Sequence, residues 1–219
     1  GDGDVLVFDG SGGNLIQVND SPAGNSYTLH FDVGGYSLSG NSIALDNPGD
    51  AIISNGTVSL ATPFELPSTA TFNVASGTLT TDGIISGAGG LTKTGPGTIV
   101  LNALNSYAGN NLISEGIAVS GMTGLGFGGF GAFNANYDKI VVESGATVYV
   151  NGSARGVAGA VDFYYGMTIA GSGTAGQGAL INTGPNNSGG NVQTPFIRLT
   201  ADATIGGTEM LEPLLAAMD

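Results

Sequence analysis

Cysteine and tryptophan are absent from the 219-residue sequence, and basic side chains are scarce. The lack of cysteine excludes disulfides, thiolate zinc sites and cysteine nucleophiles. Only Lys93, Lys139, Arg155 and Arg198 are basic, against 17 acidic residues, which gives a formal net charge of -13. Four cations cannot neutralise many phosphates, so this composition argues against nucleic-acid binding and against attraction to anionic membranes.

Long apolar runs are also lacking, and none approaches the roughly 18 residues of a membrane-spanning helix. We therefore expect no direct membrane insertion by this segment. The sequence begins at Gly1 without an initiator methionine or a signal peptide, as expected of a mature or trimmed fragment.

Glycine is abundant, with 40 residues, whereas its usual share is only about 7 %. Short runs rich in Val, Ile, Leu and Thr recur at a spacing of roughly 8–15 residues, each ended by a turn residue, as is typical of all-β proteins. Helix signals are nearly absent before residue 208. Clear examples of the runs are Tyr27–Phe31, Ala51–Ser54, Thr57–Leu60, Thr69–Val74 and Thr98–Asn102.

The predicted strands are too short for stable isolated hairpins. They become stable if each stacks on its copy in the next coil of a parallel β-helix, with glycine and asparagine at the corners. A coil of two or three such strands with its turns takes about 20–25 residues, so residues 1–207 would form roughly nine coils, each adding ~4.8 Å along the axis.

One stretch carries a more specific pattern. It reads Gly83-Ile-Ile-Ser-Gly-Ala-Gly-Gly-Leu-Thr-Lys-Thr-Gly-Pro-Gly-Thr-Ile-Val-Leu-Asn102 and continues with Asn105-Ser106-Tyr107-Ala108-Gly109 and Leu112-Ile113-Ser114-Glu115-Gly116. Residues 83–119 resemble the autotransporter-associated β-strand repeat. The departures are Pro96, Asn110-Asn111 and Val119, and none of them breaks the pattern. The signature residues in register are Lys93, Gly95, Gly97, Tyr107, Gly109 and Gly116.

The resemblance implies a right-handed, single-stranded parallel β-helix from an exported bacterial surface protein, an autotransporter passenger or a relative. The six signature residues are then structural, and Lys93 and Tyr107 are predicted to close the turn between coils. The expected inward stack consists of Ile84, Leu91, Ile99, Leu101, Leu112, Ile113 and Ile117.

Two regions break the strand pattern. Residues 121–136 are low in complexity and place phenylalanine at every third position, and a second aromatic cluster follows near residue 164. Exposed aromatic rings stack on sugars or anchor protein partners, so these rings are predicted contacts for a cell-surface glycan or protein. The alternative is that they form a lid over the apolar flank. The candidates are Phe127, Phe130, Phe133, Tyr137, Tyr164 and Tyr165.

The tail, residues 208–219, has a helical pattern, because its apolar residues fall on one face at helical spacing. It is predicted to be an amphipathic helix that caps the open end of the coils or binds a partner. A stretch foreign to the repeat region is the other interpretation. The apolar residues are Met210, Leu211, Leu214, Leu215 and Met218.

Catalytic and metal-binding patterns are weak. The single histidine, His30, lies between Leu29 and Phe31, and strand alternation points it to solvent if those two are buried. Acidic residues occur singly beside turn residues. Asp2, Asp4 and Asp9 form the only local acidic cluster, which lacks the spacing of a calcium loop. Two alternatives stay open. One is a calcium ion bound at this cluster, and the other is a catalytic pair of carboxylates brought together from different coils.

The sequence therefore favours a non-enzymatic extracellular segment, a stalk or adhesin displayed on the bacterial surface, without cofactors. Two alternatives remain. One is a self-assembling surface fibre, in which copies associate end to end. The other is a polysaccharide-active enzyme, because β-helices also carry paired catalytic carboxylates.

Overall fold

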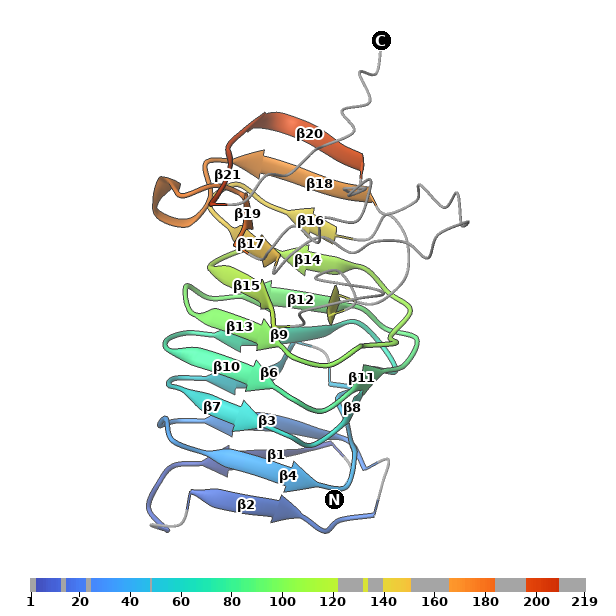
Figure 1. The fold of residues 1–219 in the computed structure, drawn as a ribbon. Coiled ribbons are helices and arrows are strands. Elements are labelled where there is room, and N and C mark those ends of the chain that lie inside the picture. The colour runs from blue at the N-terminus through green and yellow to red at the C-terminus, as the bar shows by residue number, and fades with distance from the viewer. Residues whose placement is uncertain are drawn as a thin grey trace.

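The computed structural model describes residues 3–12, 15–22, 25–47, 49–121, 132–133, 140–150, 166–183 and 196–208. These residues form a parallel β-solenoid, in which strands of each coil stack on those of the next (Figure 1). The prediction of an all-β, parallel architecture is confirmed. The predicted helical tail lies outside the described residues from residue 209 onwards, and the last described strand ends at Gly207.

Two long sheets, each of nine parallel strands within the described residues, form two faces of the solenoid. The first sheet contains β1 (Asp4–Phe8), β3 (Tyr27–Phe31), β6 (Asp50–Ser54), β9 (Ala70–Val74), β12 (Leu91–Thr94), β14 (Asn111–Ile113), β16 (Ile140–Val142), β18 (Gly166–Gly171) and β20 (Phe196–Ala203). The second contains β2 (Ile16–Asn19), β4 (Ser37–Gly40), β7 (Val58–Leu60), β10 (Thr78–Thr81), β13 (Thr98–Leu101), β15 (Ile117–Ser120), β17 (Thr147–Val150), β19 (Leu180–Asn182) and β21 (Ile205–Gly207).

A short third sheet closes the coils in the first half of the chain. It contains β5 (Ile43–Ala44), β8 (Phe64–Glu65) and β11 (Ile85–Ser86). A 3-10 turn, η2 (Thr174–Gly176), follows β18 and precedes β19.

Coil length differs between the two halves. In the first sheet Lys93 pairs with Phe72 of the preceding coil and with Ile113 of the following coil, at nearly equal steps along the chain. The next two steps, from Ile113 to Val142 and from Val142 to Ile169, are both longer. The predicted length of about 20–25 residues per coil is therefore right near the repeat and too short beyond Ile113.

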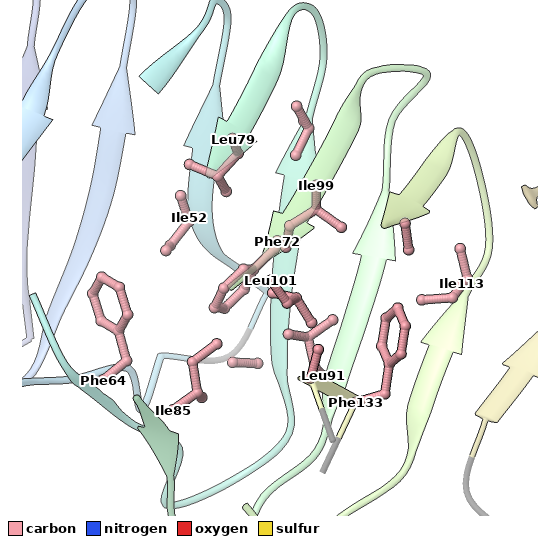
Figure 2. Close-up of a cluster of buried hydrophobic side chains, with 14 of the residues drawn as sticks. Ile52, Phe64, Phe72, Leu79, Ile85, Leu91, Ile99, Leu101, Ile113 and Phe133 are labelled. Carbon is pink, nitrogen blue, oxygen red and sulfur yellow. The ribbon is translucent and has the colours of Figure 1, made fainter. Parts of the chain in front are cut away.

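Alternation of side chains builds the core. In β9 the residues Ala70, Phe72 and Val74 are buried, while Thr71 and Asn73 between them are half-buried and face outwards. Because successive side chains of a strand point to opposite faces, every second residue contributes to an inner column of apolar side chains. Figure 2 shows such columns from several coils meeting at the axis.

Three of the residues expected in the inward stack face outwards instead. Ile84 is 53 % exposed, and its neighbour Ile85 is buried in its place. Leu112 and Ile117 are likewise only half-buried, whereas Ile113 is fully buried. Where two apolar residues are adjacent, a shift of one residue exchanges the inner and outer faces, so the sequence pattern alone did not decide between them.

Candidate interaction surface

Lys93 occupies an inward position of β12 and is fully buried. Its ammonium group donates hydrogen bonds to the carbonyl oxygens of Thr94 (2.7 Å), Gly95 (2.6 Å) and Glu115 (3.2 Å). Since Glu115 belongs to the following coil, one side chain ties two successive turns together. Burial lowers the pKa of Lys93 to about 8, and the charge of Glu115 acts in the opposite direction.

Tyr107 is also fully buried and takes part in a polar network inside the solenoid. Its hydroxyl donates to Oδ1 of Asn111, and Nδ2 of Asn111 donates to the carbonyl oxygen of Phe133 at 2.8 Å. Burial raises the pKa of the Tyr107 phenol, and the hydrogen bond to Asn111 acts in the opposite direction. The phenol is therefore a neutral donor that holds Asn111 in place.

Asn105 makes a second link of the same kind. Its Oδ1 accepts a hydrogen bond from the backbone N–H of Ile85 (2.8 Å), and its Nδ2 donates to the carbonyl oxygen of Ala132 (2.6 Å). The side-chain amide thus replaces a peptide group in the ladder beyond β11. Together Asn105 and Asn111 fix the Ala132–Phe133 pair, whose residues are both buried.

The signature glycines lie where backbones of neighbouring coils meet. Gly116 has a φ of +72°, and a Cβ there would lie 2.5 Å from the carbonyl oxygens of both Gly95 and Gly97. At Gly109 a Cβ would lie 2.4 Å from the backbone nitrogen of Gly90. No side chain fits at such distances, so the structure gives these glycines a packing role.

Of the six aromatic residues predicted to contact a partner, Phe133 lies within the residues that the structure describes. Phe133 is 1 % exposed, and its ring lies in the core near Ile113 and Leu91 (Figure 2). The prediction that this ring contacts a partner is therefore wrong, because the two asparagine links draw the segment into the interior. The other five candidates lie outside the described residues: Phe127, Phe130, Tyr137, Tyr164 and Tyr165.

Sequence reasoning missed an exposed apolar stripe that lies beside the third sheet, just before its strands β8 and β11 and in the coil that follows. The pairing of β8 with β11, and a 2.9 Å bond from the N–H of Ser106 to the carbonyl of Ile85, stack three outward residues in successive coils. These are Pro63, Ile84 and Leu104, which we call the outer stripe. All three are exposed, Ile84 by 53 % and Leu104 by 43 %. Their recurrence at the same place in three successive coils was the available signal.

Several carboxylates bind neutral side chains one coil away rather than each other. The bonds are Ser68 Oγ to Asp46 (3.0 Å), Asn73 Nδ2 to Asp50 (2.8 Å) and Asn102 Nδ2 to Asp82 (2.7 Å). Over the part of the chain that the structure describes, no three His, Asp or Glu side chains gather as metal ligands would. These acids link neighbouring coils on the surface.

His30 has the orientation predicted from alternation. Leu29 and Phe31 are fully buried, while His30 is partly exposed and its Nε2 lies 3.1 Å from a carboxylate oxygen of Asp32. Asp9 is held in its own turn, where the N–H and Oγ of Ser11 donate to it and lower the pKa of its carboxyl.

Comparison with known proteins finds a distant relative. The adhesin BmaC autotransporter of Brucella suis biovar 1 (strain 1330) is 29 % identical over 154 residues, which is 70 % of this chain. This chain is similar to an autotransporter adhesin. The predicted resemblance to autotransporter passengers is thereby confirmed, although the match spans only 4 % of the relative's length.

Two further comparisons returned nothing. No family model matches the chain, so the assignment of residues 83–119 to the autotransporter-associated repeat rests on the residues themselves. No solved structure matches it either. Within the described residues, none of the helical structure is long and apolar enough to cross a membrane.

Proposed function

We propose that this chain is a non-enzymatic adhesive segment of an exported bacterial surface protein, of the autotransporter passenger type. The observation that carries the proposal is the match to an autotransporter adhesin over 70 % of the chain. The parallel solenoid supports it, because stacked coils give a stiff rod that holds a surface away from its anchor. The same resemblance supports right-handed winding and a location outside the cell.

The outer stripe of Pro63, Ile84 and Leu104 is our proposed contact surface. Apolar side chains held on a rigid solenoid lose little conformational freedom on binding, which favours association with a protein or with the apolar face of a sugar. The aromatic residues Phe127 and Phe130 are proposed as a second contact, as the sequence predicted.

The hydrogen bonding of the acids supports a non-enzymatic role. A glycoside hydrolase needs two carboxylates flanking the scissile bond, one of them protonated. Here Asp46, Asp50 and Asp82 each accept a bond from a neutral Ser or Asn of another coil. Such carboxylates are occupied in holding coils together.

The test is binding of the labelled full-length chain to cultured epithelial cells, to matrix proteins and to a glycan array. We expect saturable binding to at least one of them, and a loss of at least about fivefold in Ile84→Lys, since burying a charge in an apolar contact is costly. Ala61→Lys is the matched control, because Ala61 is exposed on the second-sheet side and the added charge is the same.

Two results would overturn the proposal. One is the absence of binding by the wild-type chain to cells, matrix proteins and glycans alike. The other is release of oligosaccharides when the chain is incubated with bacterial or host polysaccharides, because that result would show that the chain is a polysaccharide-active enzyme.

A further inference from the structure

One corner of the solenoid joins the first sheet to the second, and glycine occupies the same place there in successive coils. Gly34, Gly56 and Gly77 contact one another at this corner, and Gly56 lies between β6 and β7. A Cβ at Gly56 would lie 2.5 Å from the backbone nitrogen of Gly34, and a Cβ at Gly77 would lie 2.8 Å from the carbonyl carbon of Gly56. The packing of the coils therefore requires glycine at position 56.

The residue before this glycine is Asn55, which is exposed. In the coils before and after, the equivalent residues are Val33 and Ser76, and neither carries a side-chain amide. Within the described residues, no hydrogen bond engages the side chain of Asn55 or the N–H of Gly56. An amide carbon that can be attacked and a nitrogen that can attack it are thus free in neighbouring residues.

Hydrogen bonds hold the backbone around this pair. The N–H of Asn55 donates to the carbonyl oxygen of Phe31 at 2.9 Å, and Ser54 Oγ donates to the carbonyl oxygen of Gly56 at 2.8 Å. From the following coil, Ser76 Oγ donates to the carbonyl oxygen of Asn55 at 2.7 Å. That oxygen and the Gly56 nitrogen belong to the same peptide group, so the bond from Ser76 acts on the nitrogen as well.

We propose that Asn55–Gly56 is a site of spontaneous deamidation, in which Ser76 assists from the next coil. When hydroxide removes the Gly56 N–H proton, the charge of the resulting peptide anion is shared with the Asn55 carbonyl oxygen. Because Ser76 Oγ already donates to that oxygen, it stabilises the charge as it develops.

The reaction exchanges water for ammonia. The Gly56 nitrogen attacks Cγ of Asn55 and forms a C–N bond. The bond from Cγ to the side-chain nitrogen breaks, and that nitrogen takes a proton from solvent and leaves as ammonia. The product is a five-membered cyclic imide. Water then opens the ring at Cγ to give aspartate, or at the main-chain carbonyl carbon to give isoaspartate. No oxidant or reductant is needed.

Other exposed asparagines of the chain lack this combination. Nδ2 of Asn102 donates to a carboxylate oxygen of Asp82 at 2.7 Å, and the residue that follows is Ala103, whose Cβ crowds its own nitrogen. Nδ2 of Asn41 donates to the carbonyl oxygen of Ser21 at 2.9 Å. Both side chains are therefore held away from the backbone nitrogen that would attack them, and they serve as internal comparisons.

Either product changes the corner. Aspartate adds a negative charge to a chain whose net charge is already -13. Isoaspartate adds a methylene group to the backbone beside Gly56, where there is no room even for a Cβ. We expect the isoaspartate form to loosen the contact between neighbouring coils and to lower the midpoint of urea denaturation. The modification thus weakens the solenoid at one defined corner.

The test is incubation of the full-length chain in mildly alkaline buffer, followed by peptide mapping with mass spectrometry. We expect Asn55 to convert to aspartate and isoaspartate at least about tenfold faster than Asn102, which corresponds to about 1.4 kcal/mol in activation free energy. The rate should rise with pH, because hydroxide removes the Gly56 proton. Mapping also separates this site from Asn151–Gly152, which lies outside the described residues.

Three variants separate the chemistry from the fold. Asn55→Gln would have to close a six-membered ring, so this position should stay intact over the same period. Ser76→Ala removes the hydroxyl that donates to the carbonyl oxygen and should slow the reaction about threefold. Ser68→Ala is its matched control, because it also removes a surface hydroxyl bond between coils, to Asp46 at 3.0 Å, and should leave the rate unchanged.

The proposal fails under either of two results. One is an Asn55 that stays intact in the folded chain while the urea-unfolded chain deamidates there, because the fold would then hold the amide away from the Gly56 nitrogen. The other is an equal rate in wild type and Ser76→Ala, which would exclude assistance from Ser76. Neither result bears on the proposed adhesive function, because the outer stripe contains none of these residues.

Discussion

The middle coils and the first coil have the same architecture but differ in how fully they bury their side chains. Between Asp50 and Ser120 the inward residues of the strands, such as Phe72 and Leu101, are at most 1 % exposed. In the first coil the inward residue Phe8 is only partly buried, and the outward residue Ile16 is 70 % exposed. Both coils consist of short strands in parallel register.

The difference shows that a coil owes its burial to neighbours on both sides rather than to its own residues. In a repeat array each unit contacts only the units next to it, so stability is approximately a sum of unit terms and interface terms. The first coil has β3 and β4 on one side only within the described residues. Substitutions in the two regions should therefore differ in effect even when the chemistry is the same.

The largest expected difference is that between Phe72→Ala and Phe8→Ala. Phe72 is fully buried with its ring edge-on to Phe64, so its loss should lower the free energy of unfolding by about 3–5 kcal/mol. Phe8 stacks on Phe31 but is half-buried, and its loss should cost roughly 1–2 kcal/mol. Urea denaturation of both variants measures this, and equal costs would show that the ends are as tightly packed as the middle.

Glycine substitutions sharpen the same contrast. Gly116→Ala places a methyl group 2.5 Å from two carbonyl oxygens of the preceding coil, at a φ of +72°, and should cost about 2–4 kcal/mol. Gly12→Ala in the first coil meets no atom within 4 Å and should be neutral or slightly stabilising. The shift in the urea midpoint separates them. A silent Gly116→Ala would mean that the coils can move apart at little cost.

Replacing a buried asparagine by alanine should cost more stability than replacing an exposed one. Asn111→Ala leaves the Tyr107 hydroxyl and the Phe133 carbonyl without their partner inside the core, at a cost of about 2–3 kcal/mol. Asn41 is exposed and bonds the carbonyl of Ser21, so Asn41→Ala should cost less than ~0.5 kcal/mol. Limited proteolysis adds a local readout, because Asn111→Ala should speed cleavage near Phe133 and Asn41→Ala should not.

Much of the fold could be predicted because strand periodicity and turn residues are local signals. The run Tyr27–Phe31 coincides with β3, and Thr98–Asn102 contains β13. Which of Ile84 and Ile85 faces the core could not be predicted in this way, because the choice depends on the register with the neighbouring coils. Because Ile84 was expected in the core, the outer stripe was not predicted.

The position of Phe133 depended on contacts that are remote in sequence. Its segment is rich in glycine and has no strand periodicity, so nothing nearby indicates burial. The links that bury it come from Asn111 and Asn105, 22 and 27 residues from their acceptors. The break in strand pattern at residues 121–136 marked where the first longer coil lies, but not how its extra residues are placed.

The smallest expected effect concerns the charge of Lys93, which stands in the same inner column that begins with Leu6 in the first coil. Burial lowers the pKa of Lys93 to about 8 in the folded chain, against about 10.4 when unfolded. Between these values the unfolded chain binds more protons, so the free energy of unfolding should rise with pH, by roughly 1–2 kcal/mol from pH 8 to pH 10.

Lys93→Met is the control, because its side chain has a similar length and cannot titrate. Below about pH 7 both the folded and the unfolded chain carry the Lys93 proton, so the stability of the wild type should not depend on pH through this group. Above pH 10 the raised pKa of Tyr107 acts in the opposite direction, since only the unfolded phenol ionises. Urea denaturation between pH 8 and pH 10 therefore isolates Lys93. Parallel curves for wild type and Lys93→Met would show that the three carbonyl acceptors stabilise the ammonium enough to offset its burial.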